Sequence, residues 1–174
     1  MNDNNFAGNS KSAVDFLGNV WNYDCMGCAI SRGEIKIPGG IIYEGKYTIL
    51  GADPEIPIPG FFIINVKRHI NSFSKLSKEE RTEIGNVIVY AEKALKELNI
   101  VKEVTLVQEE RSKHLHIWIF PNYNWMNEKF GKGITYLRTI SEYAQKNINE
   151  DGIKEVLNVI EKTRKYFNKY NINE

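Results

Sequence analysis

Two histidines, His114 and His116, stand two positions apart in the segment SKHLHIWIFPN, residues 112–122. Apolar residues alternate with them, which predicts a β-strand whose alternate side chains share a face. A neutral imidazole can attack a phosphorus atom if its second ring nitrogen is held protonated by a carbonyl. The strand therefore carries either a nucleophile for covalent catalysis or two histidines that only satisfy their own hydrogen bonds. The residue pair alone leaves both readings open. One predicted face holds His114, His116, Trp118 and Phe120, and the other holds Leu115, Ile117 and Ile119.

The only two cysteines, Cys25 and Cys28, lie in the segment CMGC. This spacing supplies two of the four ligands that a structural zinc ion needs. Two cysteines so close together do not make the disulfide framework of a small secreted protein. In a cytoplasmic chain the pair indicates half a zinc site or a redox pair, and the alternative is two reduced thiols in a small apolar corner.

Several segments have the composition of strands around the histidine segment. They are rich in β-branched and aromatic residues and are bounded by glycine or proline. Three of the five prolines fall in residues 53–60, which we expect to be a loop. The predicted strands are a hairpin over residues 39–52 and single strands over 61–66, 103–108 and 114–120.

One long helix is predicted over residues 74–99. It opens with Ser77 followed by Glu80, the pattern of a capping box, and its apolar residues then recur at helical spacing. We expect a short helix over residues 12–21 and two helices between Thr135 and Tyr170, separated near the sequence INEDG.

These elements predict an α+β fold with a mainly antiparallel sheet and one long helix. A chain of 174 residues is long enough for one sizeable core. We expect a loosely attached or disordered segment over residues 1–12, a main domain over 13–130, and a C-terminal helical extension over 131–174 that packs on it.

The composition narrows the possible partners. Twenty-three basic residues against 22 acidic ones give a net charge of +1, which argues against a large nucleic-acid surface but not against a nucleotide-sized site. No apolar run is long enough to span a membrane, and the polar N-terminus lacks the pattern of a signal peptide. We therefore expect a cytoplasmic protein with no membrane partner.

Residues 25–122 resemble the histidine triad (HIT) superfamily. The segment HLHIWIF is similar to the family signature His-φ-His-φ-His-φ-φ, in which φ is apolar. Upstream, CMGCAISRGEI resembles the Cys-x-x-Cys opening of many bacterial members. The stretch over residues 39–80 resembles the family's hairpin, Pro-Gly loop, strand, Lys-Arg-His turn and helix start, in that order. The resemblance implies a HIT-like antiparallel sheet with a long helix, to which this chain adds two C-terminal helices.

The resemblance assigns roles to residues in the signature and its surroundings. The middle histidine falls on His116, which would be the nucleophile that accepts a nucleotidyl group. Asp53 matches the acidic residue that holds the ribose hydroxyls, although an Asp-Pro pair is also a common turn initiator. The loop before the signature is shorter than usual, and Gln108 and Ser112 would take the role of its phosphate-contacting residues.

Two positions depart from the family pattern. Trp118 stands where the third histidine is expected, and Phe61 stands where many members have a histidine after Pro-Gly. Both would line the nucleotide site. Neither side chain can shuttle a proton, so the nucleophile is kept while its proton-handling neighbours are changed.

The resemblance also completes a zinc site. Bacterial members with Cys-x-x-Cys use two further histidines, which fall here on His69 of the Lys-Arg-His turn and on His114. One structural Zn²⁺ bound by Cys25, Cys28, His69 and His114 would leave only His116 free for chemistry.

Two functions of different classes follow. The first is an enzyme, a nucleotidyl hydrolase or transferase that acts through a covalent nucleotidyl-histidine. The second is a catalytically degenerate module that binds or senses nucleotides, which the Phe61 and Trp118 departures favour. Family members are commonly homodimers, joined through the long helix and an edge strand, and the resemblance implies the same here.

Overall fold

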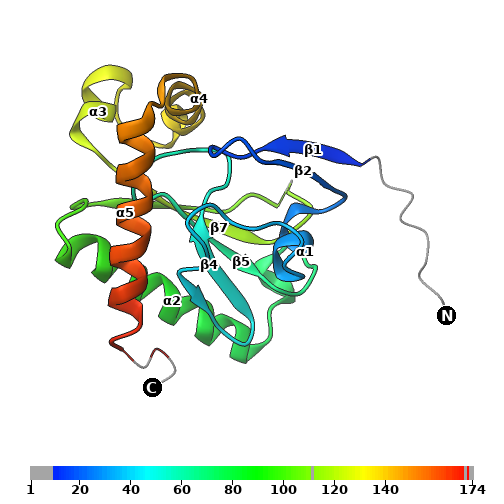
Figure 1. The fold of residues 1–174 in the computed structure, drawn as a ribbon. Coiled ribbons are helices and arrows are strands. Elements are labelled where there is room, and N and C mark those ends of the chain that lie inside the picture. The colour runs from blue at the N-terminus through cyan, green and yellow to red at the C-terminus, as the bar shows by residue number, and fades with distance from the viewer. Residues whose placement is uncertain (1–9, 111, 171, 173–174) are drawn as a thin grey trace.

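The computed structural model describes residues 10–110, 112–170 and 172 (Figure 1). Its centre is a five-stranded sheet in which every neighbouring pair is antiparallel. The strand order is β3-β4-β5-β7-β6, so the histidine strand β7 lies between β5 and β6. The five strands are β3 (Tyr43–Glu44), β4 (Thr48–Ala52), β5 (Phe62–Val66), β6 (Val104–Val107) and β7 (His116–Pro121). The predicted α+β class, hairpin and strands are confirmed.

The N-terminal region differs from the expectation. A short helix was predicted over residues 12–21, but this segment forms a separate two-stranded sheet of β1 (Lys11–Val14) and β2 (Val20–Tyr23). The buried carboxylate of Asp15 accepts hydrogen bonds from the backbone N–H groups of Leu17 and Asn19, and Gly18 adopts a φ of 88°. An aspartate that binds the backbone a few residues on favours a turn over a helix. Residues 1–9 of the segment that we expected to be loosely attached lie outside the described residues, whereas Lys11 begins β1.

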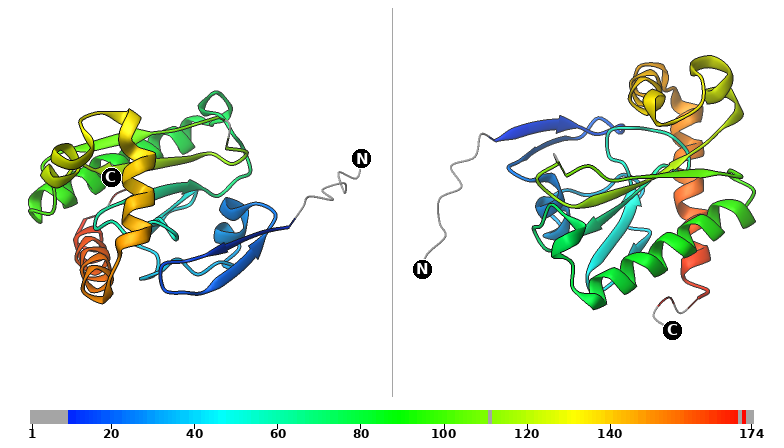
Figure 2. Two further views of the ribbon diagram at one scale, coloured as in Figure 1. Left: turned by 90° about the horizontal axis from the view of Figure 1, so that it is seen from above. Right: turned by 180° about the vertical axis from the view of Figure 1, so that it is seen from behind.

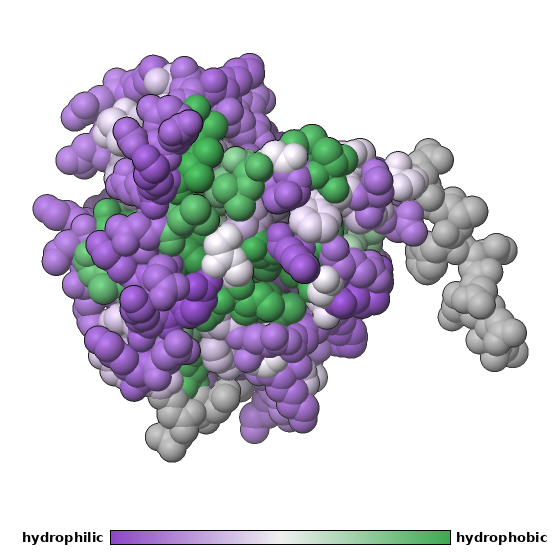
Figure 3. All heavy atoms as spheres, in the orientation of Figure 1, coloured by the Kyte–Doolittle hydropathy of each residue, from purple (hydrophilic) through white to green (hydrophobic). Residues whose placement is uncertain are grey.

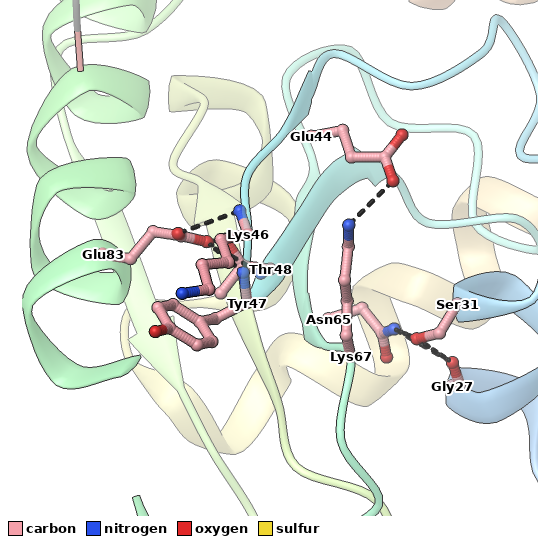
Figure 4. Close-up of polar contacts among 9 residues, drawn as sticks. All are labelled: Gly27, Ser31, Glu44, Lys46, Tyr47, Thr48, Asn65, Lys67 and Glu83. Carbon is pink, nitrogen blue, oxygen red and sulfur yellow. Dashed lines mark hydrogen bonds and ion pairs between the residues drawn. The ribbon is translucent and has the colours of Figure 1, made fainter. Parts of the chain in front are cut away.

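Helix α2 (Lys78–Glu97) covers one face of the sheet. The predicted capping box is present: the Ser77 hydroxyl accepts from the Glu80 N–H and the Glu80 carboxylate accepts from the Ser77 N–H. Its apolar side packs on Leu115, Ile117 and Ile119, the residues predicted to face the core. In Figure 4 the buried Glu83 of α2 reaches the β3–β4 turn and accepts hydrogen bonds from the backbone of residues 46–48.

The C-terminal helices cover two further sides of the sheet. Helices α3 (Asn124–Phe130) and α4 (Leu137–Asn147) lie on the opposite side of the sheet from α2, and α5 (Glu150–Phe167) runs alongside the sheet and contacts α2 (Figures 1 and 2). The two helices predicted between Thr135 and Tyr170 are therefore confirmed. Helix α5 contributes Val156, Val159, Ile160, Tyr166 and Phe167 to the main core.

The same helices present polar residues outward. Figure 3 shows a hydrophilic surface over α3, α4 and much of α5, with hydrophobic residues gathered in a band beside α5. None of the helices in the described part of the chain combines the length and apolar character that a membrane span requires.

Candidate metal centre and histidine strand

The structure brings together the four residues proposed as zinc ligands. Cys25 precedes the short helix α1 (Met26–Ser31) and Cys28 lies within it, while His69 is in the turn after β5 and His114 comes just before β7. One ligand atom from each residue lies within 4.8 Å of the others. Residues up to 89 positions apart in the sequence thus meet at one point.

The spacing of the four ligand atoms fits a tetrahedral metal ion. The Cys25 sulfur lies 3.5 Å from Nδ1 of His69 and 3.3 Å from Nδ1 of His114, and the corresponding distances from the Cys28 sulfur are 3.1 and 3.5 Å. The two Nδ1 atoms are 3.4 Å apart. A tetrahedral zinc ion at ordinary bond lengths separates its sulfur and nitrogen ligands by roughly 3.3–3.8 Å. Three of the four sulfur–nitrogen distances lie in this range and the one between Cys28 and His69 is slightly shorter, so the donor types and the overall spacing suit zinc.

The ring of His114 is oriented with its Nδ1 lone pair toward the cluster. Its other nitrogen, Nε2, lies 2.7 Å from the backbone carbonyl of Val66 and donates a hydrogen bond to it, which leaves Nδ1 unprotonated. Burial, more than the neighbouring histidines, also lowers the pKa of His114 and favours the neutral form that binds metals. Burial and then the adjacent Cys25 raise the pKa of the Cys28 thiol to about 11, so a metal ion has to displace a proton there.

Helix α1 is fixed to the sheet by a buried asparagine, Asn65 of β5. In Figure 4 its side-chain amide donates to the Gly27 carbonyl and to the Ser31 hydroxyl, both at 3.0 Å. Asn65 is also the direct partner of His116 in the β5–β7 ladder, so it links the cysteine helix to the histidine strand.

The His69 turn is fixed from the other side. The guanidinium of Arg68 donates to both carboxylate oxygens of Glu80, at 3.0 and 2.9 Å, at the start of α2. This paired contact holds the turn against the helix, and the backbone turn that follows brings the exposed His69 to the cluster.

Gly27→Ala should disrupt this centre. A Cβ atom at position 27 would lie 2.3 Å from Cδ2 of the His114 ring and 2.6 Å from Oδ1 of Asn65, so the helix or the ring must move. We expect a loss of about 1–3 kcal/mol in the free energy of unfolding, together with weaker metal binding. Urea unfolding with and without added zinc measures both effects. Gly85→Ala on α2 is the matched control, because its Cβ meets no atom within 4 Å.

His116 has the arrangement that a nucleophilic imidazole needs. Its Nδ1 lies 3.0 Å from the backbone carbonyl of His114 and donates to it, which leaves a lone pair on Nε2. The Ser112 hydroxyl donates to the same carbonyl at 3.0 Å and lies 3.4 Å from Nδ1 of His116. Ser112 thus supports the orientation of the ring.

The two positions that depart from the family pattern pack against each other. The ring centroids of Phe61 and Trp118 are 5.2 Å apart with their planes at 73°, and Phe61 also contacts Phe120. Phe61 is only 1% exposed, so its ring presents little surface in this structure, and its place in the nucleotide site stays a prediction. The physical reason is that α3 and α4 cover this end of the histidine face with Met126, Leu137 and Ile140. Trp118 stays half-buried at the border of this apolar cluster.

Asp53 forms a turn, as the simpler reading of the Asp-Pro pair predicts. Its Oδ1 accepts from the backbone N–H groups of Glu55 and Ile56, at 2.8 and 2.9 Å. Burial outweighs these bonds and raises the pKa of Asp53 to about 6. Both hydrogen bonds end on Oδ1, so the second carboxylate oxygen stays free of these turn contacts.

Gln108 follows β6 directly, one residue after Val107, which pairs with Trp118. Its side-chain nitrogen is buried and has no hydrogen-bond partner within the described residues. A buried amide donor without a partner is uncommon, and a phosphate oxygen would satisfy it.

Three residues with positioning roles escaped the sequence reasoning: Gly27, Asn65 and Arg68. Only Asn65 left a signal, since it is a lone amide inside the apolar run FFIINV. A polar residue in a buried strand requires a partner, but the sequence does not say which.

Comparisons with solved structures identify the fold. The chain is similar to a Zn-bound histidine triad family protein from Mycobacterium smegmatis, with a TM-score of 0.58 and 14% identity over 84% of this chain and 97% of that one. A hypothetical histidine triad nucleotide-binding protein from Sulfolobus tokodaii strain7 gives a TM-score of 0.58 and 15% identity, over 81% of this chain and 92% of that one. A member of the HIT family from Bacillus subtilis gives 0.53 and 18%, over 74% and 99%. No family model matches the sequence, and no curated protein sequence matches it.

Proposed function

We propose that this chain, which has the fold of the histidine triad proteins, is a zinc-containing nucleotidyl hydrolase or transferase that forms a covalent nucleotidyl-histidine on His116. Its solved neighbours include a protein named as Zn-bound and one named as nucleotide-binding, which supports the zinc site and the binding of a nucleotide. Zinc bound by Cys25, Cys28, His69 and His114 would be structural, and it would fix helix α1 and the His69 turn beside the histidine strand.

The contact between Nδ1 of His116 and the His114 carbonyl carries the proposal. It holds the imidazole in the tautomer whose Nε2 can attack, and it stabilises the positive charge that develops on the ring as the bond to phosphorus forms. Water then cleaves the nitrogen–phosphorus bond in a hydrolase, and a second acceptor does so in a transferase. Ser112 supports the ring, Asp53 offers a carboxylate oxygen to the ribose, and the buried amide of Gln108 would reach a phosphate only after its loop moves.

The surroundings of His116 favour leaving groups that are stable as anions. A poor leaving group, such as an amine, needs a proton as it departs, and general acid catalysis typically contributes about 10²–10⁴-fold. Trp118 cannot supply that proton, Phe61 is buried against it, and metal binding would occupy His114. Phosphoric anhydrides are therefore better substrates for this site than alkyl phosphoramidates.

Trapping the intermediate tests the proposal directly. The protein is mixed with a dinucleoside polyphosphate radiolabelled at the α-phosphate and quenched in alkali, in which a phosphorus–nitrogen bond to histidine survives. We expect label on the peptide that contains His116. Binding of the nucleotide without any adduct or turnover would instead support the second candidate, a nucleotide-binding module, which the packing of Trp118 against Phe61 favours.

Asp53→Ala should weaken the binding of ribonucleotides more than that of their deoxy analogues. The carboxyl group accepts hydrogen bonds from the ribose hydroxyls more strongly when it is ionised, and its pKa is about 6. The affinity of the unmodified protein for ribonucleotides should therefore fall as the pH drops through about 6, and this component of the fall should vanish in Asp53→Ala. Isothermal titration with both nucleotide types between pH 5 and 8 measures these affinities. If Asp53→Ala weakened the binding of ribo- and deoxyribonucleotides equally, Asp53 would only form its turn and would not contact the ribose.

The homodimer expected from the resemblance remains a prediction. Strand β6 is the edge of the described sheet that it would use, and Leu106 on that strand is 45% exposed. Analytical ultracentrifugation distinguishes a dimer from a monomer.

A further inference from the structure

A cavity lies beside the end of the histidine strand that is farther from His116. Its volume is about 840 Å³, and small-molecule sites in proteins typically measure roughly 300–1,000 Å³. It is bordered by the end of α2, the α2–β6 connection, the β7–α3 connection and α3. Figure 1 shows α3 and the end of α2 on the side of the molecule opposite α1. The described residues that line the cavity include neither a proposed metal ligand nor a residue of the proposed nucleotide site.

The backbone shapes the walls of this cavity. Asn99 turns the chain after α2 with a φ of 54°. Lys132 stands between two glycines whose φ angles are 102° and 105°, a region that residues with a side chain rarely adopt. The Asn122 N–H donates to the Glu103 carbonyl at 3.0 Å and so joins the connection after β7 to the one before β6. The cavity therefore depends on fixed turns and not only on the positions of long side chains.

Several hydrogen-bond donors of the cavity have no partner. The ammonium groups of Lys102 and Lys132 and the side-chain amides of Asn124 and Asn127 form neither a hydrogen bond nor an ion pair with any residue that the structure describes. The indole N–H of Trp125 has no hydrogen-bond partner there either. Ammonium and indole groups can only donate, so together these side chains suit a ligand rich in acceptors.

The charge of the cavity is positive. Lys96, Lys102 and Lys132 line it together with a single described carboxylate, that of Glu103. Lys96 pairs with Glu92, which does not line the cavity, at 3.1 Å, so two ammonium groups remain for one carboxylate. The chain as a whole has a net charge of only +1, so this excess is local. It favours an anionic ligand, and a phosphate group accepts charge-assisted hydrogen bonds from lysine.

Trp125 offers the cavity an aromatic ring. Its side chain is 39% exposed, and its ring centroid lies 6.3 Å from that of Phe130 and 6.0 Å from that of Tyr143. These neighbours hold the indole while part of it lines the cavity. Heterocycles stack favourably on aromatic side chains whatever their pattern of donors and acceptors. The Glu103 carboxylate can accept a hydrogen bond from a hydroxyl or amino group of the same ligand.

We propose that this cavity is a binding site for a small ligand that combines a phosphate group with a flat heterocycle, of which a nucleoside monophosphate is a simple example. The phosphate accepts hydrogen bonds from Lys102 and Lys132, and the heterocycle stacks on Trp125. Glu103 and the asparagine amides bind hydroxyl and amino groups. The inference does not rest on the reaction proposed at His116, because the cavity shares no described residue with that site.

The alternative is an ordinary basic surface whose lysines and asparagines contact only water. Such a surface attracts any anion weakly and in proportion to its charge. A built site instead requires the phosphate and the ring together. It therefore binds adenosine monophosphate more tightly than it binds inorganic phosphate, which lacks the ring, or adenosine, which lacks the charge.

NMR of the full chain as purified tests the inference. The chain has three tryptophans, so single Trp→Phe variants assign the three indole N–H signals. Trp125 reports on the cavity and Trp118 on the histidine face. Trp21, whose indole N–H donates to Asp15 at 3.1 Å, is the reference. The probes are adenosine monophosphate, inorganic phosphate and adenosine. We expect adenosine monophosphate to shift the Trp125 signal with a Kd below about 1 mM, and the other two to bind there at least about tenfold more weakly.

Two double variants show whether the lysines act as proposed. Lys102→Ala/Lys132→Ala should raise the Kd measured at the Trp125 signal at least about tenfold, because it removes two charge-assisted hydrogen bonds. The response of the Trp118 signal should stay unchanged. Lys146→Ala/Lys154→Ala, which removes two exposed lysines of α4 and α5, is the control for the loss of positive charge and should leave both signals as they were.

Three results would overturn the inference. They are a Trp125 signal that does not respond to adenosine monophosphate, equal affinity for inorganic phosphate and adenosine monophosphate, and an unchanged Kd in Lys102→Ala/Lys132→Ala. The same titration separates this inference from the proposed function. A response of Trp125 without any response of Trp118 would count against nucleotide binding at the histidine face and would support the site at this cavity.

Discussion

His116→Ala is expected to reduce nucleotidyl transfer by roughly 10³-fold or more, because no other side chain around the histidine face, among the residues that the structure describes, can replace the attacking nitrogen. The other two histidines lie in the metal cluster, and Nδ1 of His114 points to the cysteines and not to the site. Nucleotide affinity should change by less than about threefold, since we propose that the ribose and phosphate contacts come from Asp53 and Gln108.

The measurement is a pair of assays on the same preparation. Single-turnover kinetics with a dinucleoside polyphosphate report the chemical step, and isothermal titration with a non-hydrolysable analogue reports affinity. Lys113→Ala is the matched control, since it changes an exposed residue three positions away. Turnover near that of the unmodified protein in His116→Ala would show that His116 is only part of the site's surface.

Removal of zinc is expected to have the largest effect on stability. The cluster joins the cysteine helix α1, the turn after β5 and the start of β7, so the ion would cross-link segments far apart in the chain. Structural zinc binds zinc-finger peptides with apparent free energies of about 10–16 kcal/mol, and part of that energy is lost as folding energy when the metal is removed. We expect chelation to cost at least about 3 kcal/mol in the free energy of unfolding, which lowers Tm by roughly 6–12 °C for a chain of this size.

Metal analysis and calorimetry together check the predicted loss of stability on zinc removal. The protein as purified should hold one equivalent of zinc, and Cys28→Ser should melt like the chelated protein and respond no further to chelator. Zinc affinity should fall as the pH decreases, because the pKa of the Cys28 thiol is about 11 without metal and protons compete with the ion. Well under one equivalent of metal, or a Cys28→Ser protein with unchanged melting, would contradict the proposed site.

The sequence by itself determined the elements around the site. The alternation of His114 to Phe120 predicted a strand with two unlike faces, and the structure buries Leu115, Ile117 and Ile119 against α2. Ser77 and Glu80 predicted the start of the long helix, because a capping box satisfies backbone donors within one turn. Such features depend on residues close together in the chain, and local periodicity reports them. The helix predicted over residues 12–21 was wrong. There the hydrogen bonds of the Asp15 side chain favour a turn between two strands over a helix.

The family resemblance predicted that the four metal ligands meet, and the tertiary structure decided which other distant groups do. It placed Asn65 between the cysteine helix and His116, left no room for a side chain at Gly27 beside the His114 ring, and covered Phe61 with α3 and α4. It also brought Lys102 and Lys132 to one cavity with Trp125. These contacts depend on how helices and strands pack at long range. Neither the spacing nor the type of these two lysines in the sequence distinguishes them from any other exposed basic residue.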